Sequence, residues 1–70
     1  MSTQEIQRRL DAAEAMAEEA CDLCDQAILR WHARDYAGFV WHLRQGIAML
    51  GCAAVAFDTI ANECERLTKS

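Results

Sequence analysis

Residues 36–64, YAGFVWHLRQGIAMLGCAAVAFDTIANEC, decide the fold. Apolar side chains recur along this stretch at alternating steps of four and three residues. A repeat of this kind places its members on one face of an α-helix, so it predicts a helix over about residues 36–68. The members of this first stripe are Tyr36, Val40, Leu43, Ile47, Leu50, Ala54, Phe57, Ala61 and Cys64.

The N-terminal half carries the same period. Ser2 and Glu5 form a capping-box pattern, in which Ser2 caps the helix and Glu5 reaches back to the Ser2 amide. The pattern predicts a helix over about residues 3–31. Its apolar seam consists of Ile6, Leu10, Ala13, Ala17, Ala20, Cys24, Ala27 and Trp31.

A short turn is predicted over residues 32–35, with Asp35 as the N-cap of the second helix. Two helices of nearly equal length joined by a short turn fold back on each other. The chain has no proline and three glycines among 70 residues, which favours helices throughout. The predicted fold class is therefore all-α, an antiparallel two-helix hairpin that forms a single domain over residues 1–70.

A second stripe lies beside the first, and one partner helix cannot cover both. We expect the larger side chains of the first stripe, Leu43, Leu50 and Phe57, to pack over the small residues of the N-terminal helix. The second stripe is then expected to pair with a second copy, giving a homodimeric four-helix bundle. The alternative is that it only widens the core face of one hairpin. The expected dimer-interface residues of the second stripe, which continues to Leu67, are Phe39, Gly46, Met49, Ala53, Ala56 and Ile60.

Negative charge is concentrated in the N-terminal helix. Residues 1–29 contain seven carboxylates and two arginines, a net charge of −5, whereas the whole chain has −4. Five of these carboxylates form a stripe that we call the acidic rail: Asp11, Glu14, Glu18, Asp22 and Asp25. One interpretation is a solvated face that keeps an alanine-rich helix soluble. The other is a docking surface for a basic protein, such as one that grips DNA phosphates.

Arginine and aromatic residues gather near the turn. Residues 30–44 hold both tryptophans, the tyrosine, both histidines and three arginines. Trp41 lies on neither stripe, and a tryptophan beside arginines is typical of a binding hot spot. It could equally lie along the helix surface. Arg34 and Trp41 therefore join the acidic rail as candidate partner-binding residues.

The four cysteines invite a metal site. Cys21 and Cys24 form a C-x-x-C motif inside a predicted helix, but zinc would need two further ligands. Cys52 and Cys64 are roughly 18 Å apart along their helix and cannot both complete that site. We expect reduced structural thiols, with no metal and no cofactor, and a metal or redox module at Cys21 and Cys24 is the alternative.

The sequence does not favour an enzyme. It contains no glycine-rich phosphate loop, no H-E-x-x-H and no G-x-S-x-G motif, so no catalytic residue is proposed. The longest charge-free run, residues 45–57, is shorter than a membrane span requires. Polar residues follow Met1, so no signal peptide is expected. We expect a cytoplasmic protein without a membrane partner.

Two families resemble parts of the chain. Residues 33–39, ARDYAGF, continuing through Leu43 to Leu50, resemble the turn and second helix of a tetratricopeptide repeat, which implies a helical hairpin. Tyr36, Leu43, the segment AMLG at 48–51 and the alanines after it resemble small phage-encoded quorum-sensing anti-activators. That resemblance implies a homodimer that binds the DNA-binding domain of a LuxR-type regulator and blocks it from DNA.

Three functions follow from these patterns. The first is a phage or mobile-element inhibitor that sequesters a host protein, with the acidic rail as its docking surface. The second is an RNA- or nucleotide-binding hairpin dimer that uses Arg34 and Arg44, similar in layout to the plasmid copy-number regulator that binds paired RNA loops. Nucleic acid requires a positive face, which the acidic N-terminal helix lacks, so this function ranks lower. The third is the cysteine module.

Overall fold

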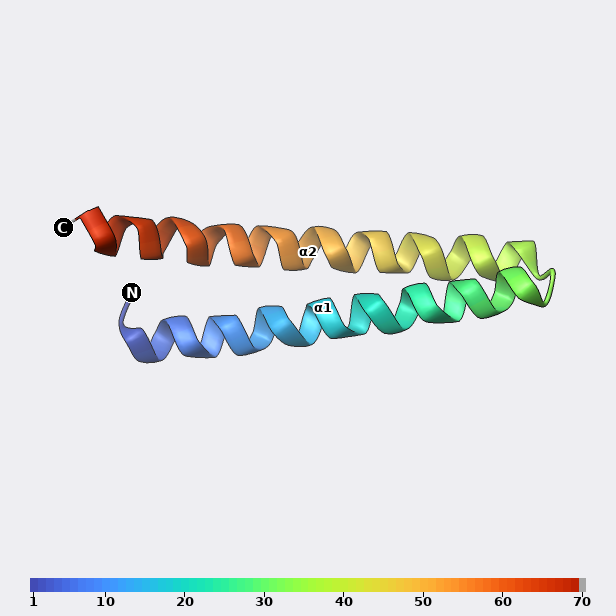
Figure 1. Cartoon of the computed structure of the whole chain (residues 1–70), viewed down its shortest axis with the longest axis horizontal. Coiled ribbons are helices and arrows are strands. Elements are labelled where there is room, and N and C mark those ends of the chain that lie inside the picture. The colour runs from blue at the N-terminus through green and yellow to red at the C-terminus, as the bar shows by residue number, and fades with distance from the viewer. Residues whose placement is uncertain (70) are drawn as a thin grey trace.

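A computed structural model describes residues 1–69 as two antiparallel helices, α1 (Thr3–His32) and α2 (Tyr36–Lys69), shown in Figure 1. The predicted all-α hairpin is confirmed, and each helix ends within one residue of its expected bound. The molecule measures 54 × 17 × 12 Å, and its radius of gyration is 15.9 Å. A compact chain of this length would have a radius near 11 Å, so the hairpin is a rod one layer thick.

The N-terminus of α1 is capped as the sequence predicts. The Glu5 amide donates to Ser2 Oγ at 3.1 Å. The Glu5 side chain does not complete the capping box and instead accepts from Arg9 at 3.3 Å. At the same end of the rod the Met1 ammonium group lies 3.1 Å from Glu63 Oε2. The Met1 ammonium group and Arg66 both lower the pKa of Glu63. The contact with Met1 also ties the two free helix ends together.

The turn is closed by backbone hydrogen bonds on both sides of Arg34. The Asp35 amide donates to Arg30 O at 2.9 Å, and the Arg34 amide donates to Trp31 O at 3.0 Å. These are the two bonds of a Schellman motif, which needs a left-handed residue at its centre. Arg34 supplies it, with φ of 61°. Asp35 then caps α2, because its Oδ1 accepts from the Gly38 amide at 3.0 Å.

The two helices meet along small side chains. Ala13, Ala20 and Ala27 of α1 are at most 1% exposed. On α2, a Cβ added at Gly46 would lie 3.6 Å from the Ala20 carbonyl oxygen and 3.1 Å from Cys24 Sγ. The backbones therefore approach closely here, and glycine is the residue that leaves room for Cys24.

This contact corrects the expected roles of the two stripes. The second stripe, expected to pair with another chain, packs against α1 within the hairpin. Its buried members are Gly46, Ala53 and Ile60, and its half-buried members are Phe39, Met49 and Ala56. The first stripe, expected to fill the core, is largely exposed, with Leu50 at 46% and Phe57 at 38%. The second stripe is therefore not available as a dimer interface.

Side-chain size explains why the second stripe, and not the first, packs against α1. Small residues recur every seven positions on α1, at Ala13, Ala20 and Ala27, and on α2 at Gly46 and Ala53. When such rows face each other, the helix axes come close and the interface is filled without cavities. A row of leucines over the same alanines would hold the axes apart. Most of the large side chains consequently lie beside the contact, and the described residues include no large side chain that is less than 2% exposed.

We predict that Ala20→Leu destabilises the hairpin whereas Ala15→Leu does not. Ala20 is 0% exposed, so three extra carbons must separate the helices, at a cost of about 1–3 kcal/mol in unfolding free energy. Ala15 is exposed on the same helix, and the same substitution should stay within about 0.5 kcal/mol. Urea denaturation followed by circular dichroism measures both. Equal midpoints for the two variants would contradict the close helix contact.

Candidate partner-binding surfaces

The acidic rail is a continuous exposed surface on α1. All five of its carboxylates are exposed. They recur at steps of three and four, so neighbours are about 5–6 Å apart and the rail is roughly 21 Å long. Asp11 accepts a hydrogen bond from Gln7 Nε2 at 2.9 Å. Within residues 1–69 none of the five carboxylates forms an ion pair, so their charge is not neutralised by the hairpin itself.

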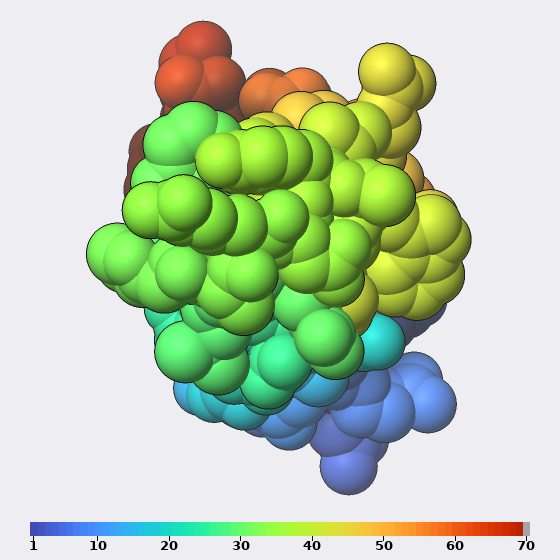
Figure 2. Space-filling model, turned by 90° about the vertical axis from the view of Figure 1, so that its right-hand side faces the viewer, coloured from blue at the N-terminus to red at the C-terminus, as the bar shows by residue number. Residues whose placement is uncertain are grey.

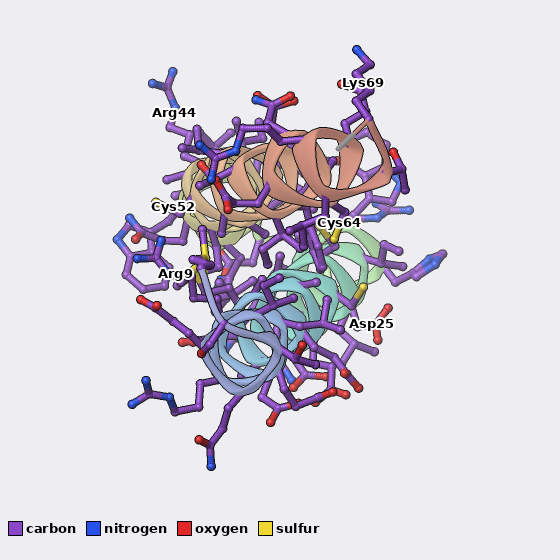
Figure 3. The ribbon with its side chains drawn as sticks, turned by 90° about the vertical axis from the view of Figure 1, so that its left-hand side faces the viewer. Arg9, Asp25, Arg44, Cys52, Cys64 and Lys69 are labelled. Atoms are coloured by element: carbon purple, nitrogen blue, oxygen red, sulfur yellow. The ribbon has the colours of Figure 1, made fainter. Side chains whose placement is uncertain are left out.

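The acidic rail faces largely away from α2, because its residues lie about 120–200° round α1 from the buried Ala20. Figure 3 views the rod from its two termini and labels the last residue of each: Asp25 of the rail and Cys64 of the first stripe. Asp25 projects to the right of α1 in this view, Cys64 lies on the side of α2 that is turned toward α1, and Arg9 and Cys52 lie to the left. The hairpin thus exposes an apolar surface on α2 and a negative surface on α1. From the sequence the first stripe is expected in the core, so this exposed apolar surface is not predicted.

The first stripe makes α2 unusually apolar for an uncovered helix. Ile47 is 59% exposed and Val40 is 44% exposed. By length and composition α2 could cross a membrane, because its most apolar window of 18 residues has a mean hydropathy of 1.3. Only 11% of that window is buried. The apolar residues of α2 therefore lie mostly at the surface rather than against α1.

Aromatic side chains cluster at the turn. The ring of Trp31 lies 5.5 Å from that of Tyr36 and 5.3 Å from that of Phe39, between centroids. Trp31 and Tyr36 are nevertheless 53% and 56% exposed. Figure 2 looks onto this end and shows residues near the turn, coloured green, covering the end of the rod. The cluster caps the hairpin, but much of its apolar surface still faces solvent.

The other candidate residues near the turn are Arg34 and Trp41. Trp41 is 57% exposed, and its ring and that of His42 are arranged edge to face with centroids 4.8 Å apart. His42 is held by Nδ1, which donates to the Gly38 carbonyl at 2.8 Å. Arg34 is exposed, while its neighbour Arg30 lies 3.7 Å from the Asp35 carboxylate. The structure thus leaves Trp41 and Arg34 accessible but places neither of them on the acidic rail.

The cysteines remain separate thiols. Cys21, Cys52 and Cys64 are exposed, and Cys24 is half-buried against Gly46. Across residues 1–69 no three His, Cys, Asp or Glu side chains come together in a way that could hold a metal ion. The Cys21–Cys24 motif therefore has no third ligand in this hairpin. Any zinc there would have to draw ligands from elsewhere.

We predict that Arg34→Gly stabilises the hairpin while Arg34→Ala does not. Any side chain with a Cβ is strained at φ of 61°, and glycine removes a strain of about 1 kcal/mol. Both variants remove the same charge, so the comparison separates strain from electrostatics. Thermal melts by circular dichroism would show a higher melting temperature for the glycine variant only. Equal melting temperatures would mean that the turn is not strained at this position.

Comparison of the chain with protein-family models, with curated proteins and with solved structures finds no match. The resemblance to the anti-activators therefore rests on the residues quoted for it. The exposed surfaces of this hairpin are what bear on its function.

Proposed function

We propose that this chain is a small, non-enzymatic protein-binding module that sequesters a host regulatory protein, with a basic DNA-binding surface as the target. The observation that supports this is the acidic rail, whose five exposed carboxylates have no cationic partner among the described residues. Like charges at these spacings destabilise an isolated helix by a few tenths of a kcal/mol per pair. A bound basic surface would relieve that repulsion.

Regulators that bind DNA present lysine and arginine rows to a line of phosphates. The acidic rail offers carboxylates along roughly 21 Å of a rigid helix, which such a basic row could engage instead of DNA. A rail that occupies the same basic groups prevents DNA binding by competition. The resemblance to phage anti-activators points the same way, and the proposed setting is the cytoplasm of a bacterial host.

We predict that Glu18→Lys weakens target binding whereas Glu19→Lys leaves it nearly unchanged. Both substitutions change the net charge equally, but only Glu18 belongs to the acidic rail, since Glu19 lies 100° further round the helix. Reversing one central charge should raise the Kd roughly tenfold, and adding Asp22→Lys should weaken binding further. Raising the salt from about 0.1 M to 1 M should weaken the wild type, because the Debye length falls from about 10 Å to 3 Å.

The experiment immobilises the wild type, Glu18→Lys and Glu19→Lys as baits in lysate of the host, with and without nuclease. Quantitative mass spectrometry measures the proteins that each bait retains. A target of the rail is retained by wild type and by Glu19→Lys, lost from Glu18→Lys, and unaffected by nuclease. It should also fail to bind its DNA when the wild-type hairpin is added. Retention that depends on nuclease-sensitive material, or equal retention by all three baits, would contradict the proposal and favour the arginines near the turn.

A further inference from the structure

The isolated hairpin exposes more surface than a chain of its mass should. Its accessible area is 5241 Å², whereas a globular monomer of 7.9 kDa is expected to expose about 4400 Å². The excess is about 800 Å², which equals what each partner contributes to a stable interface of standard size. A long apolar part of this surface is the first stripe, which runs almost the whole length of α2.

The length and composition of the first stripe favour a long helical partner without net charge. It contains no charged residue from Tyr36 to Cys64, a length of roughly 42 Å at 1.5 Å per residue. A sustained heptad repeat packs best against another helix with the same repeat. Helix α2 itself has that length and that repeat, and its charges balance, with Arg44, Arg66 and Lys69 against Asp58, Glu63 and Glu65.

No contact within one hairpin explains why residue 51 is a glycine. A Cβ added there would meet no atom within 4 Å, in contrast to Gly46. Glycine in the middle of a helix is less stable than alanine, so its presence at an open position is unfavourable for the monomer. Gly51 lies immediately beside Leu50, the midpoint of the first stripe. A glycine beside the centre of an apolar stripe lets a second helix cross closely there.

Arg44 and Asp58 lie symmetrically about Gly51. Each is seven residues away, so all three belong to one heptad row beside the first stripe, on the edge that α1 does not cover. The two side chains are about 21 Å apart along α2 and cannot meet within one chain. Within the described part of the chain neither forms an ion pair. Opposite charges placed at equal distances from a central glycine are complementary to a second copy running in the opposite direction.

We propose that a second copy of this chain covers the first stripe, with the two α2 helices packed antiparallel and crossing at Gly51. A two-fold axis at Gly51 places the heptad row of Arg44, Gly51 and Asp58 opposite the same row of the second copy. Arg44 of each chain then meets Asp58 of the other. Parallel helices would instead bring each row against a different row of the partner. The same register brings large side chains next to small ones, with an offset of about 3 Å along the axis: Leu50 lies near Ala54 and Leu43 near Ala61 of the second copy.

The proposed dimer also determines where the two acidic rails lie. Because α1 packs on the second stripe in both copies, the two α1 helices lie on the same side of the α2 pair. The two rails then lie on one face of the dimer and present ten carboxylates. This dimer does not depend on the proposed function, since it can form whether or not a basic target exists.

The first test is the mass of the wild type, Ile47→Glu and Val55→Glu, measured by light scattering at about 50 µM. Ile47 and Val55 are 59% and 68% exposed in the hairpin, so neither substitution should alter its helix content. We expect twice 7.9 kDa for the wild type and Val55→Glu, and 7.9 kDa for Ile47→Glu, which would bury an unpaired charge. A monomeric wild type, or a dimeric Ile47→Glu, would overturn the proposal. So would a wild type that is monomeric until phosphatidylcholine vesicles capture it.

The second test fixes the direction of the helices by exchanging charges. Arg44→Asp or Asp58→Arg alone places like charges opposite each other at two sites per dimer, and each should raise the dimer Kd about tenfold. The double variant restores both pairs and should return within about threefold of wild type. Sedimentation equilibrium at low salt measures all four proteins. Single variants without effect, or a double variant weaker than either single one, would overturn the antiparallel arrangement.

Discussion

The close approach of α1 and α2 at Gly46 determines the rest of this structure. With the Ala20 carbonyl oxygen only 3.6 Å from the place of a Gly46 Cβ, no large side chain fits between the helices at this level. The core is therefore narrow and consists mainly of alanine and glycine, with Ile60 as its one large member among the described residues. Every leucine, valine and tryptophan of α2 must lie to the side of the contact or away from it. The exposed first stripe is thus a direct consequence of the way in which the hairpin is closed.

Charge and apolar surface are divided between the two helices. The acidic rail lies on α1, whereas the charges of α2 cancel and its surface is apolar. A single helix carrying both features would place carboxylates against any apolar partner and lose stability by desolvation. Because the features lie on different helices, the hairpin can cover its apolar surface and still leave its carboxylates in solvent. The turn, closed around Arg34, keeps the two surfaces in fixed register.

The sequence predicts much of this fold, because heptad spacing, the Ser2 cap and the Asp35 cap are local signals. It also predicts that the acidic rail is exposed, since steps of three and four place all five carboxylates on one face. The choice between two adjacent stripes of α2 could not be made from the period, because both repeat every seven residues. Side-chain size decided it, and the informative signal was the matching period of small residues at Ala13, Ala20 and Ala27 and at Gly46 and Ala53. The exposure of the first stripe follows from that choice.

The seven-residue repetition of the helix contact has a consequence for how such a chain can change in length. Alanines at 13, 20 and 27 are equivalent positions along α1, as Gly46 and Ala53 are along α2. Loss or gain of one heptad in both helices would give a shorter or longer hairpin with the same contacts. Loss of a heptad in α1 alone would preserve the contact but slide the carboxylates by roughly 10 Å along the apolar surface. Natural variation in such proteins would therefore proceed by paired seven-residue steps, with unpaired steps altering recognition while the fold is retained.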